Sequence, residues 1–136
     1  METIVKALHF QQKKKLMKAV TKLIEALKME NPKNLKTLSD AVKKPHENFI
    51  VSEINDSCLR LAVNEGEYPW HYHSNSDEFF IVLEGELTIE FQDKPMVSLK
   101  PKDTFLVPKG LIHKTKANGR TVNLCFEKLE SDSVFI

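Results

Sequence analysis

Residues Tyr68–Glu86 read YPWHYHSNSDEFFIVLEGE and carry a His-x-His pair, His71 and His73, followed by an acidic residue, Glu78. Side chains of an extended strand alternate between its two faces, so His71 and His73 share one face. The odd-numbered step to Glu78 would place its carboxylate on the opposite face of an unbroken strand. Because the intervening Ser74-Asn75-Ser76-Asp77 is a turn-type cluster that resets the register, we expect Glu78 to join the two histidines.

A third histidine, His113, follows later in the sequence VPKGLIHK. Taken alone, a His-x-His pair on a strand is more often exposed or hydrogen-bonded than metal-binding, but a further carboxylate and imidazole change that balance. Three neutral imidazoles and one carboxylate suit zinc, iron, nickel, manganese or copper, and rarely calcium. The sequence therefore predicts a site for one divalent transition metal ion, with His71, His73, Glu78 and His113 as ligands.

Short runs of apolar and β-branched residues surround these positions and continue from Pro45 to near the end of the chain. The runs span residues 49–51, 58–63, 79–83, 87–91, 96–99, 104–107 and 121–126. Turn-forming residues separate them, among them Asn64-Glu65-Gly66 and Asn118-Gly119. Regular short strands with such punctuation predict an all-β fold, an antiparallel sandwich or barrel.

The N-terminal region has a different period. Its apolar residues recur at helical spacing, which predicts an amphipathic helix from about Gln11 to Glu30. Asn31-Pro32 ends this helix, because proline cannot continue the hydrogen-bond ladder. Residues 34–44 are ambiguous and fit a short turn of helix. We therefore expect a helical extension over residues 1–33 and a β-barrel domain over residues 34–136.

Charge is divided unequally along the chain. Residues 1–44 contain eleven lysines and four acidic residues, whereas the remainder contains nine basic and fifteen acidic residues. This asymmetry favours docking of the helix on the barrel, or on a partner subunit. The helix lacks the interfacial aromatic residues of a membrane-binding segment and the arginine and aromatic pattern of a nucleic-acid-binding one, so we expect neither partner.

Composition and the start of the sequence indicate a cytoplasmic location. No apolar run approaches the roughly 20 residues that cross a bilayer, and METIVKALHFQQKKK lacks the apolar stretch of a secretory signal. The two cysteines, Cys58 and Cys125, lie in apolar segments and are expected to be buried thiols rather than a disulfide.

Two spacings resemble the motifs of a known family. Gly66-x4-His71-x-His73-x4-Glu78-x6-Gly85 resembles the first cupin motif, and Pro108-x-Gly110-x2-His113 resembles the second. The resemblance covers about residues 34–127 and is strongest to the small stand-alone cupins described as mannose-6-phosphate-isomerase-like. It implies a double-stranded β-helix, or jelly-roll barrel, that binds a metal ion inside its mouth through the four residues named above. It also implies that two such barrels pair as a homodimer.

Three positions depart from the cupin pattern. The first glycine, Gly66, lies one residue closer to the histidines than usual, Lys102 occupies the position where the second motif usually begins with glycine, and Asn118 lies one place beyond the usual asparagine. None of the three is an expected ligand, and the first two alter turns outside the expected site.

Other residues have two interpretations each. An apolar set could line a pocket around the metal, although core packing is the more common role of such residues; it comprises Phe80, Val82, Phe105, Val107 and Phe126. Arg60 could face an anionic ligand or solvent. Trp70 and Tyr72 fall on the strand face opposite the histidines, where an interface or a second sheet could cover them.

The leading functional hypothesis is a metal-dependent enzyme of the isomerase, epimerase or dioxygenase type that acts on a small polar molecule. The sequence assigns no catalytic side chain beyond the expected ligands. The alternatives are a non-catalytic cupin that binds a small ligand through its metal, and a structural dimer in which the metal stiffens the barrel.

Overall fold

The computed structural model describes residues 1–27 and 31–136, and the chain divides into two compact units, Met1–Lys33 and Asn34–Ile136. The described part of the first unit contains one helix, α1 (Glu2–Leu27). This helix begins well before Gln11, where the apolar stripe indicated a start, because residues 2–10 contain no glycine or proline and Lys6 pairs with Glu2 one turn away at 2.9 Å. The expected helix end near Glu30 lies outside the described residues.

The apolar residues of α1 are exposed, with Leu16, Leu23 and Leu27 retaining 64%, 60% and 75% of their accessible surface. Within residues 1–27 and 31–136, no helix is long and apolar enough to cross a membrane.

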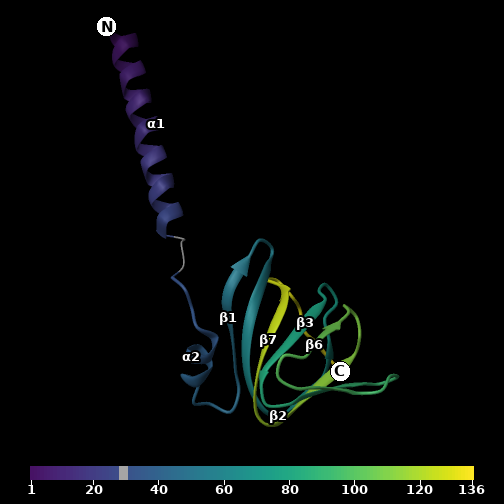
Figure 1. The fold of residues 1–136 in the computed structure, drawn as a ribbon. Coiled ribbons are helices and arrows are strands. Elements are labelled where there is room, and N and C mark those ends of the chain that lie inside the picture. Colours follow the sequence, from purple (N-terminus) through teal and green to yellow (C-terminus); the bar gives the residue numbers. More distant parts are fainter. Residues whose placement is uncertain (28–30) are drawn as a thin grey trace. The chain divides into compact units, whose positions relative to one another are not determined.

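The second unit contains one short helix and eight strands (Figure 1). Helix α2 (Leu35–Asp40) fits the short turn of helix expected here, and the side chain of its N-cap residue Asn34 accepts a hydrogen bond from the Thr37 backbone N–H at 2.9 Å. The strands are β1 (Glu47–Ile54), β2 (Ser57–Tyr72), β3 (Glu78–Glu84), β4 (Leu87–Phe91), β5 (Val97–Leu99), β6 (Thr104–Val107), β7 (His113–Lys128) and β8 (Val134–Phe135).

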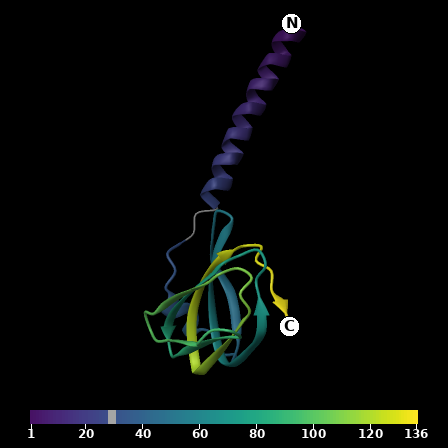
Figure 2. The same cartoon turned by 90° about the vertical axis from the view of Figure 1, so that its right-hand side faces the viewer.

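All strand pairs are antiparallel, and the main path through the sheet runs β1-β2-β7-β3-β6. Strand β7 also pairs with β4, β4 pairs with β5, and β8 pairs with β2. The strands curl into a barrel, which Figure 2 shows from its side. The expected all-β jelly-roll fold with an N-terminal helix is confirmed.

Two of the expected turns are instead irregularities inside long strands. Strand β2 continues through Asn64-Glu65-Gly66, with a register shift against β7 between Asn64 and Gly66, and β7 continues through Asn118-Gly119. Gly66 and Gly119 have φ angles of 77° and 73°. Because a glycine with positive φ serves a β-bulge as well as a turn, the sequence alone did not distinguish the two.

Alternation along β2 separates a core layer from the barrel interior. Leu61 and Val63 are fully buried and belong to a cluster against which Leu35 and Leu38 of the α2 region pack. The alternate residues, Arg60, Ala62 and Asn64, line a cavity inside the barrel. A second apolar cluster contains Phe80, Val82, Leu87 and Ile89 from β3 and β4. The cysteines Cys58 and Cys125 are buried and free, as expected.

Candidate metal centre

Three neighbouring strands position the four candidate ligands. His71 lies near the end of β2, His113 begins β7 and Glu78 begins β3, whereas His73 lies just beyond the end of β2. His71 and His113 are directly opposite each other in the β2–β7 pairing, and their ring centroids are 4.4 Å apart. The antiparallel register thus brings together two histidines that are distant in sequence.

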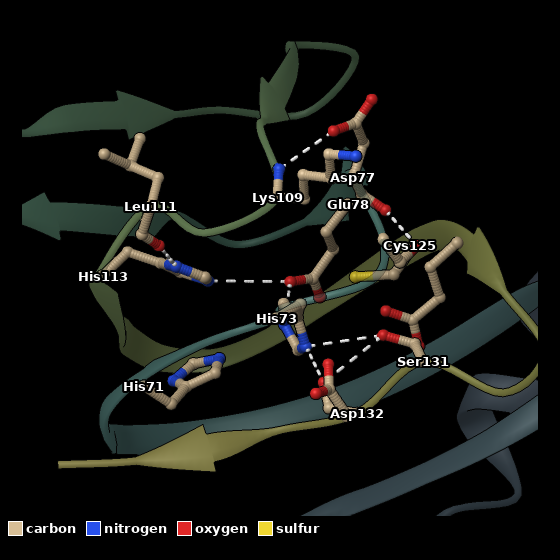
Figure 3. Close-up of polar contacts among 12 residues, drawn as sticks. His71, His73, Asp77, Glu78, Lys109, Leu111, His113, Cys125, Ser131 and Asp132 are labelled. Carbon is tan, nitrogen blue, oxygen red and sulfur yellow. Dashed lines mark hydrogen bonds and ion pairs between the residues drawn. The ribbon is translucent and has the colours of Figure 1, made fainter.

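The side chains of His71, His73, Glu78 and His113 converge on one point (Figure 3). One nitrogen or oxygen atom from each lies within 4.8 Å of all the others. All four side chains are nearly or fully buried, and His113 is completely inaccessible. The structure therefore assembles the whole set of residues that the sequence singled out.

The turn between the histidine pair and Glu78 is fixed by hydrogen bonds to the loop before β7. The backbone N–H of Gly110 donates to the carbonyl of His73 at 2.7 Å, and the backbone N–H of Lys109 donates to Asp77 Oδ1 at 2.9 Å. Residues 73–77 are outside any strand, so the alternation is interrupted and Glu78 points to the same side as the histidines.

Each imidazole has its Nδ1 atom on a backbone carbonyl. His71 Nδ1 lies 2.7 Å from the Pro69 oxygen and His113 Nδ1 lies 2.8 Å from the Leu111 oxygen. His73 Nδ1 lies 2.5 Å from the oxygen of Asp132, in the C-terminal segment. Because a carbonyl only accepts, each Nδ1 carries the proton and the lone pair of each neutral ring is on Nε2. This arrangement orients histidine ligands in metal sites.

The inner atoms of the cluster lack ordinary partners. Among the described residues, His73 Nε2, His113 Nε2 and Glu78 Oε2 are buried side-chain atoms without a hydrogen bond. Glu78 Oε2 lies 2.7 Å from His73 Nε2 and 3.6 Å from His113 Nε2. Since lone pairs of a carboxylate and a neutral imidazole repel at such distances, a cation or a proton must lie between them. The donor set and its unpartnered atoms fit a divalent transition metal ion.

Ionisation of the metal-free cluster follows from the same contacts. Burial opposes protonation of His73, but a protonated ring would donate from Nε2 to Glu78 Oε2, 2.7 Å away, and this bond and the charge of Glu78 raise the pKa of His73 to about 9. Burial also opposes ionisation of Glu78, yet the adjacent His113 and His73 rings stabilise its anion and lower the pKa of Glu78 to about 2. Burial lowers the pKa of His71, which favours the neutral, metal-binding form of that ring. Glu78 therefore remains an anion when either a proton or a metal ion occupies the centre.

A cavity of about 560 Å³ adjoins the cluster, with His71 and Glu78 in its wall. Much of the remaining wall is polar. Asn64 donates to Asn123 Oδ1 at 2.9 Å, and Asn123 in turn donates to Cys125 Sγ at 3.3 Å. Sequence reasoning missed Asn64 and Asn123, because an asparagine inside a strand carries no signal that distinguishes a cavity wall from a solvent-facing position.

The other candidate residues have mixed outcomes. Phe80, Val82 and Val107 belong to the apolar cluster, against which Phe105 packs. Of these four residues, only Phe80 also lines the cavity. Phe126 does not line the cavity and is 39% exposed, because it has the same strand parity as Leu124, whose side chain belongs to the other core layer.

Arg60 lies in the cavity wall, where its Nε pairs with Glu127 at 3.0 Å. Trp70 and Tyr72 alternate with the buried His71 and are both half-buried, and Lys114 lies 5.4 Å from the Trp70 ring centroid.

The fold and this centre define a class: a small β-barrel with a buried three-histidine, one-carboxylate cluster. The cupin domain family matches residues 58–126, and the chain belongs to this family.

The chain is also similar to individual proteins, one of which carries a cupin description. The protein YdbB of Bacillus subtilis (strain 168) is 52% identical over 108 residues, which cover 79% of this chain and 96% of YdbB. The crystal structure of a cupin-2 domain containing protein from Shewanella frigidimarina NCIMB 400 is 31% identical, with a TM-score of 0.67 over 71% of this chain and 93% of that chain. Hydroquinone 1,2-dioxygenase from Sphingomonas sp. TTNP3, 17% identical, shares the fold with a TM-score of 0.61 over 73% of this chain and 74% of its own.

Proposed function

We propose that this cupin is a metal-dependent enzyme acting on a small polar molecule, with one divalent transition metal ion held by His71, His73, Glu78 and His113. Zinc, iron, nickel and manganese all suit this ligand set. The observation that carries the proposal is the group of buried, unpartnered Nε2 and Oε2 atoms that face one another at the centre of the cluster. In a protein without an ion, a proton would have to lie between His73 and Glu78, and His113 Nε2, 3.6 Å from Glu78 Oε2, would remain buried without a hydrogen bond, which is costly.

When bound, the ion would polarise a substrate oxygen as a Lewis acid, which suits an isomerase or epimerase, or, if redox-active, would support chemistry with dioxygen, which suits a dioxygenase. The chain contributes orientation and selection. His71 and Glu78 belong both to the cluster and to the cavity wall, so a molecule in the cavity lies beside the centre. The volume of about 560 Å³ suits a small molecule, and Asn64, Asn123 and Arg60 provide polar groups for one.

Metal content tests the first half of the proposal. We expect about one transition metal ion per chain by elemental analysis of protein purified from ordinary medium, and its loss in His113→Ala. His9→Ala is the matched control, because His9 is an exposed histidine of α1. Retention of stoichiometric metal by His113→Ala would refute the ligand assignment, as would a wild-type protein that binds none of the four metals when each is supplied.

Turnover tests the second half. The loaded protein should convert a member of a panel of sugar phosphates, keto acids, thiols and dihydroxybenzenes, and the Glu78→Gln variant should not. Ligands that raise the melting temperature without being converted would instead identify a non-catalytic binding protein.

A further inference from the structure

The C-terminal segment, residues 130–136, lies against the candidate metal centre. Its strand β8 pairs with the end of β2, so that Phe135 is opposite His71 and Val134 is opposite Tyr72. The Phe135 ring is 5.8 Å from the His71 ring, centroid to centroid. In Figure 2 this segment forms the yellow end of the chain at the edge of the barrel. The end of β2, with His71, is therefore flanked by Val134 and Phe135.

Asp132 makes the closest contacts of this segment with the ligand loop. Its carbonyl accepts the hydrogen bond from His73 Nδ1. Its carboxylate accepts from the Ser74 backbone N–H at 2.7 Å and from the Ser74 hydroxyl, and its own backbone N–H donates to Asn75 Oδ1 at 3.1 Å. Asn75 also donates to the carbonyl of Glu130 at 2.8 Å. The side chain thus clamps Ser74, and this clamp holds the Asp132 carbonyl against His73. Figure 3 shows Asp132 beside the His73 ring.

His73 differs in this respect from the other two imidazoles. His71 and His113 have Nδ1 on the carbonyl two residues earlier, a contact that their own stretch of chain provides. The carbonyl that faces His73 Nδ1 comes from the other end of the domain. His73 lies beyond the last residue of β2, and although Gly110 N–H holds its backbone carbonyl, its own stretch of chain provides no carbonyl for Nδ1. The orientation of this one ring therefore depends on docking of the C-terminal segment.

We propose that Asp132 is a positioning residue of the metal centre, which fixes the proton of His73 on Nδ1 and aims Nε2 at the ion. This proposal rests on the proposed metal function. It follows that the C-terminal segment and the ion stabilise each other's binding, since a coupling between two binding events is reciprocal.

The first test is zinc affinity, measured by competition with a chromogenic chelator. Asp132→Ala removes the clamp and should weaken zinc binding about 10-fold to 100-fold, the usual effect of losing a partner of a histidine ligand. Asp132→Asn preserves an acceptor for the Ser74 N–H and should restore most of the affinity. Asp103→Ala is the matched control, because the Asp103 carboxylate also accepts a backbone N–H, that of Lys100 at 2.9 Å, in a different turn. Equal affinities for Asp132→Ala and wild type would overturn the proposal, as would an equal loss in Asp103→Ala.

The second test reads the His73 ring directly and needs no metal. In metal-free protein labelled with nitrogen-15 at histidine, the Nδ1 proton of His73 should be shifted downfield and exchange slowly with solvent. That signal should disappear in Asp132→Ala and remain in Asp132→Asn and Asp103→Ala. Its persistence in a folded Asp132→Ala protein would overturn the positioning role. A wild-type protein that shows the signal yet binds no zinc would refute the proposed function alone.

Discussion

Gly85 should tolerate no side chain, and a matched pair of glycine substitutions can show why. Gly85 has a φ of 78°, and a Cβ atom added to it would lie 2.6 Å from the backbone oxygen of Arg120 and 2.6 Å from Thr121 Oγ1. Neither atom can move easily. Thr121 is fully buried, and its hydroxyl hydrogen-bonds with the Glu86 carbonyl at 3.1 Å. Gly66 has a similar φ of 77°, but a Cβ atom added there would meet no atom within 4 Å.

Alanine at either position carries the penalty of the left-handed conformation, roughly 1–2 kcal/mol. At Gly85 the steric overlap adds about 1–3 kcal/mol, the usual range for overpacking. We therefore expect Gly85→Ala to lower the free energy of unfolding by about 2–5 kcal/mol, and Gly66→Ala by about 1–2 kcal/mol. The two variants differ by the steric part, about 1–3 kcal/mol. At roughly 4–8 °C per kcal/mol, Gly85→Ala should melt about 4–24 °C below Gly66→Ala.

Calorimetry and urea titration in the presence of a chelator give the cleanest comparison, since a bound ion would stabilise each variant by mass action. Unfolding free energies for the two variants that agree within about 0.5 kcal/mol would refute the steric argument, because that is the normal scatter of such measurements at independent sites.

Further predictions concern other parts of the chain. Lys102 has a φ of 77°, which is unfavourable for any residue other than glycine. Lys102→Gly removes this strain but gives the unfolded chain more conformational freedom, so the free energy of unfolding in a urea titration should rise by about 0.5–1 kcal/mol. In metal-free protein the pKa of His73 is raised from 6.5 to about 9. The protonated His73 ring should therefore stabilise the fold fully below pH 6.5, and this stabilisation should be lost as pH rises through about 9. Melting temperatures of the wild type and of His73→Gln, measured in chelator across this pH range, test the expectation. Removing residues 1–30 should leave the zinc stoichiometry of the remaining chain unchanged, because the four candidate ligands belong to the second unit. We also expect the full chain to be a homodimer, with the exposed apolar residues of α1 contributing to self-association, and light scattering of full-length and truncated protein should show weaker association in the latter.

Most of the barrel could be predicted from the sequence, because its strands alternate strongly between apolar and polar residues. Leu87 and Ile89 are buried in β4 as their spacing indicated. The errors occurred where one residue type serves two structures. Gly66 and Gly119 mark bulges within long strands, although glycine followed by polar residues is equally typical of a turn. The two-residue strand β8 is too short to show any period.

The grouping of the four candidate ligands could also be predicted, since their types and spacing are unusual outside a metal site. Their supporting contacts could not. The carbonyls of Pro69 and Leu111 belong to the backbone and have no sequence signature, and Asp132 is one of several acidic residues near the C-terminus. The parity of Phe126 was misjudged because it depends on the register of β7 against its neighbours, which tertiary pairing determines.

The pairing of β2 with β7 has a consequence for the order of folding. These strands are joined along most of their lengths, from Ser57 opposite Lys128 to His71 opposite His113, so every contact between them closes a long loop of chain. Domains dominated by such non-local contacts fold slowly, in roughly milliseconds to seconds. His71 and His113 meet only when this pairing is complete, so the chain offers an ion few of its ligands before then. Refolding should therefore proceed at the same rate with or without zinc, while unfolding should be much slower when zinc is bound.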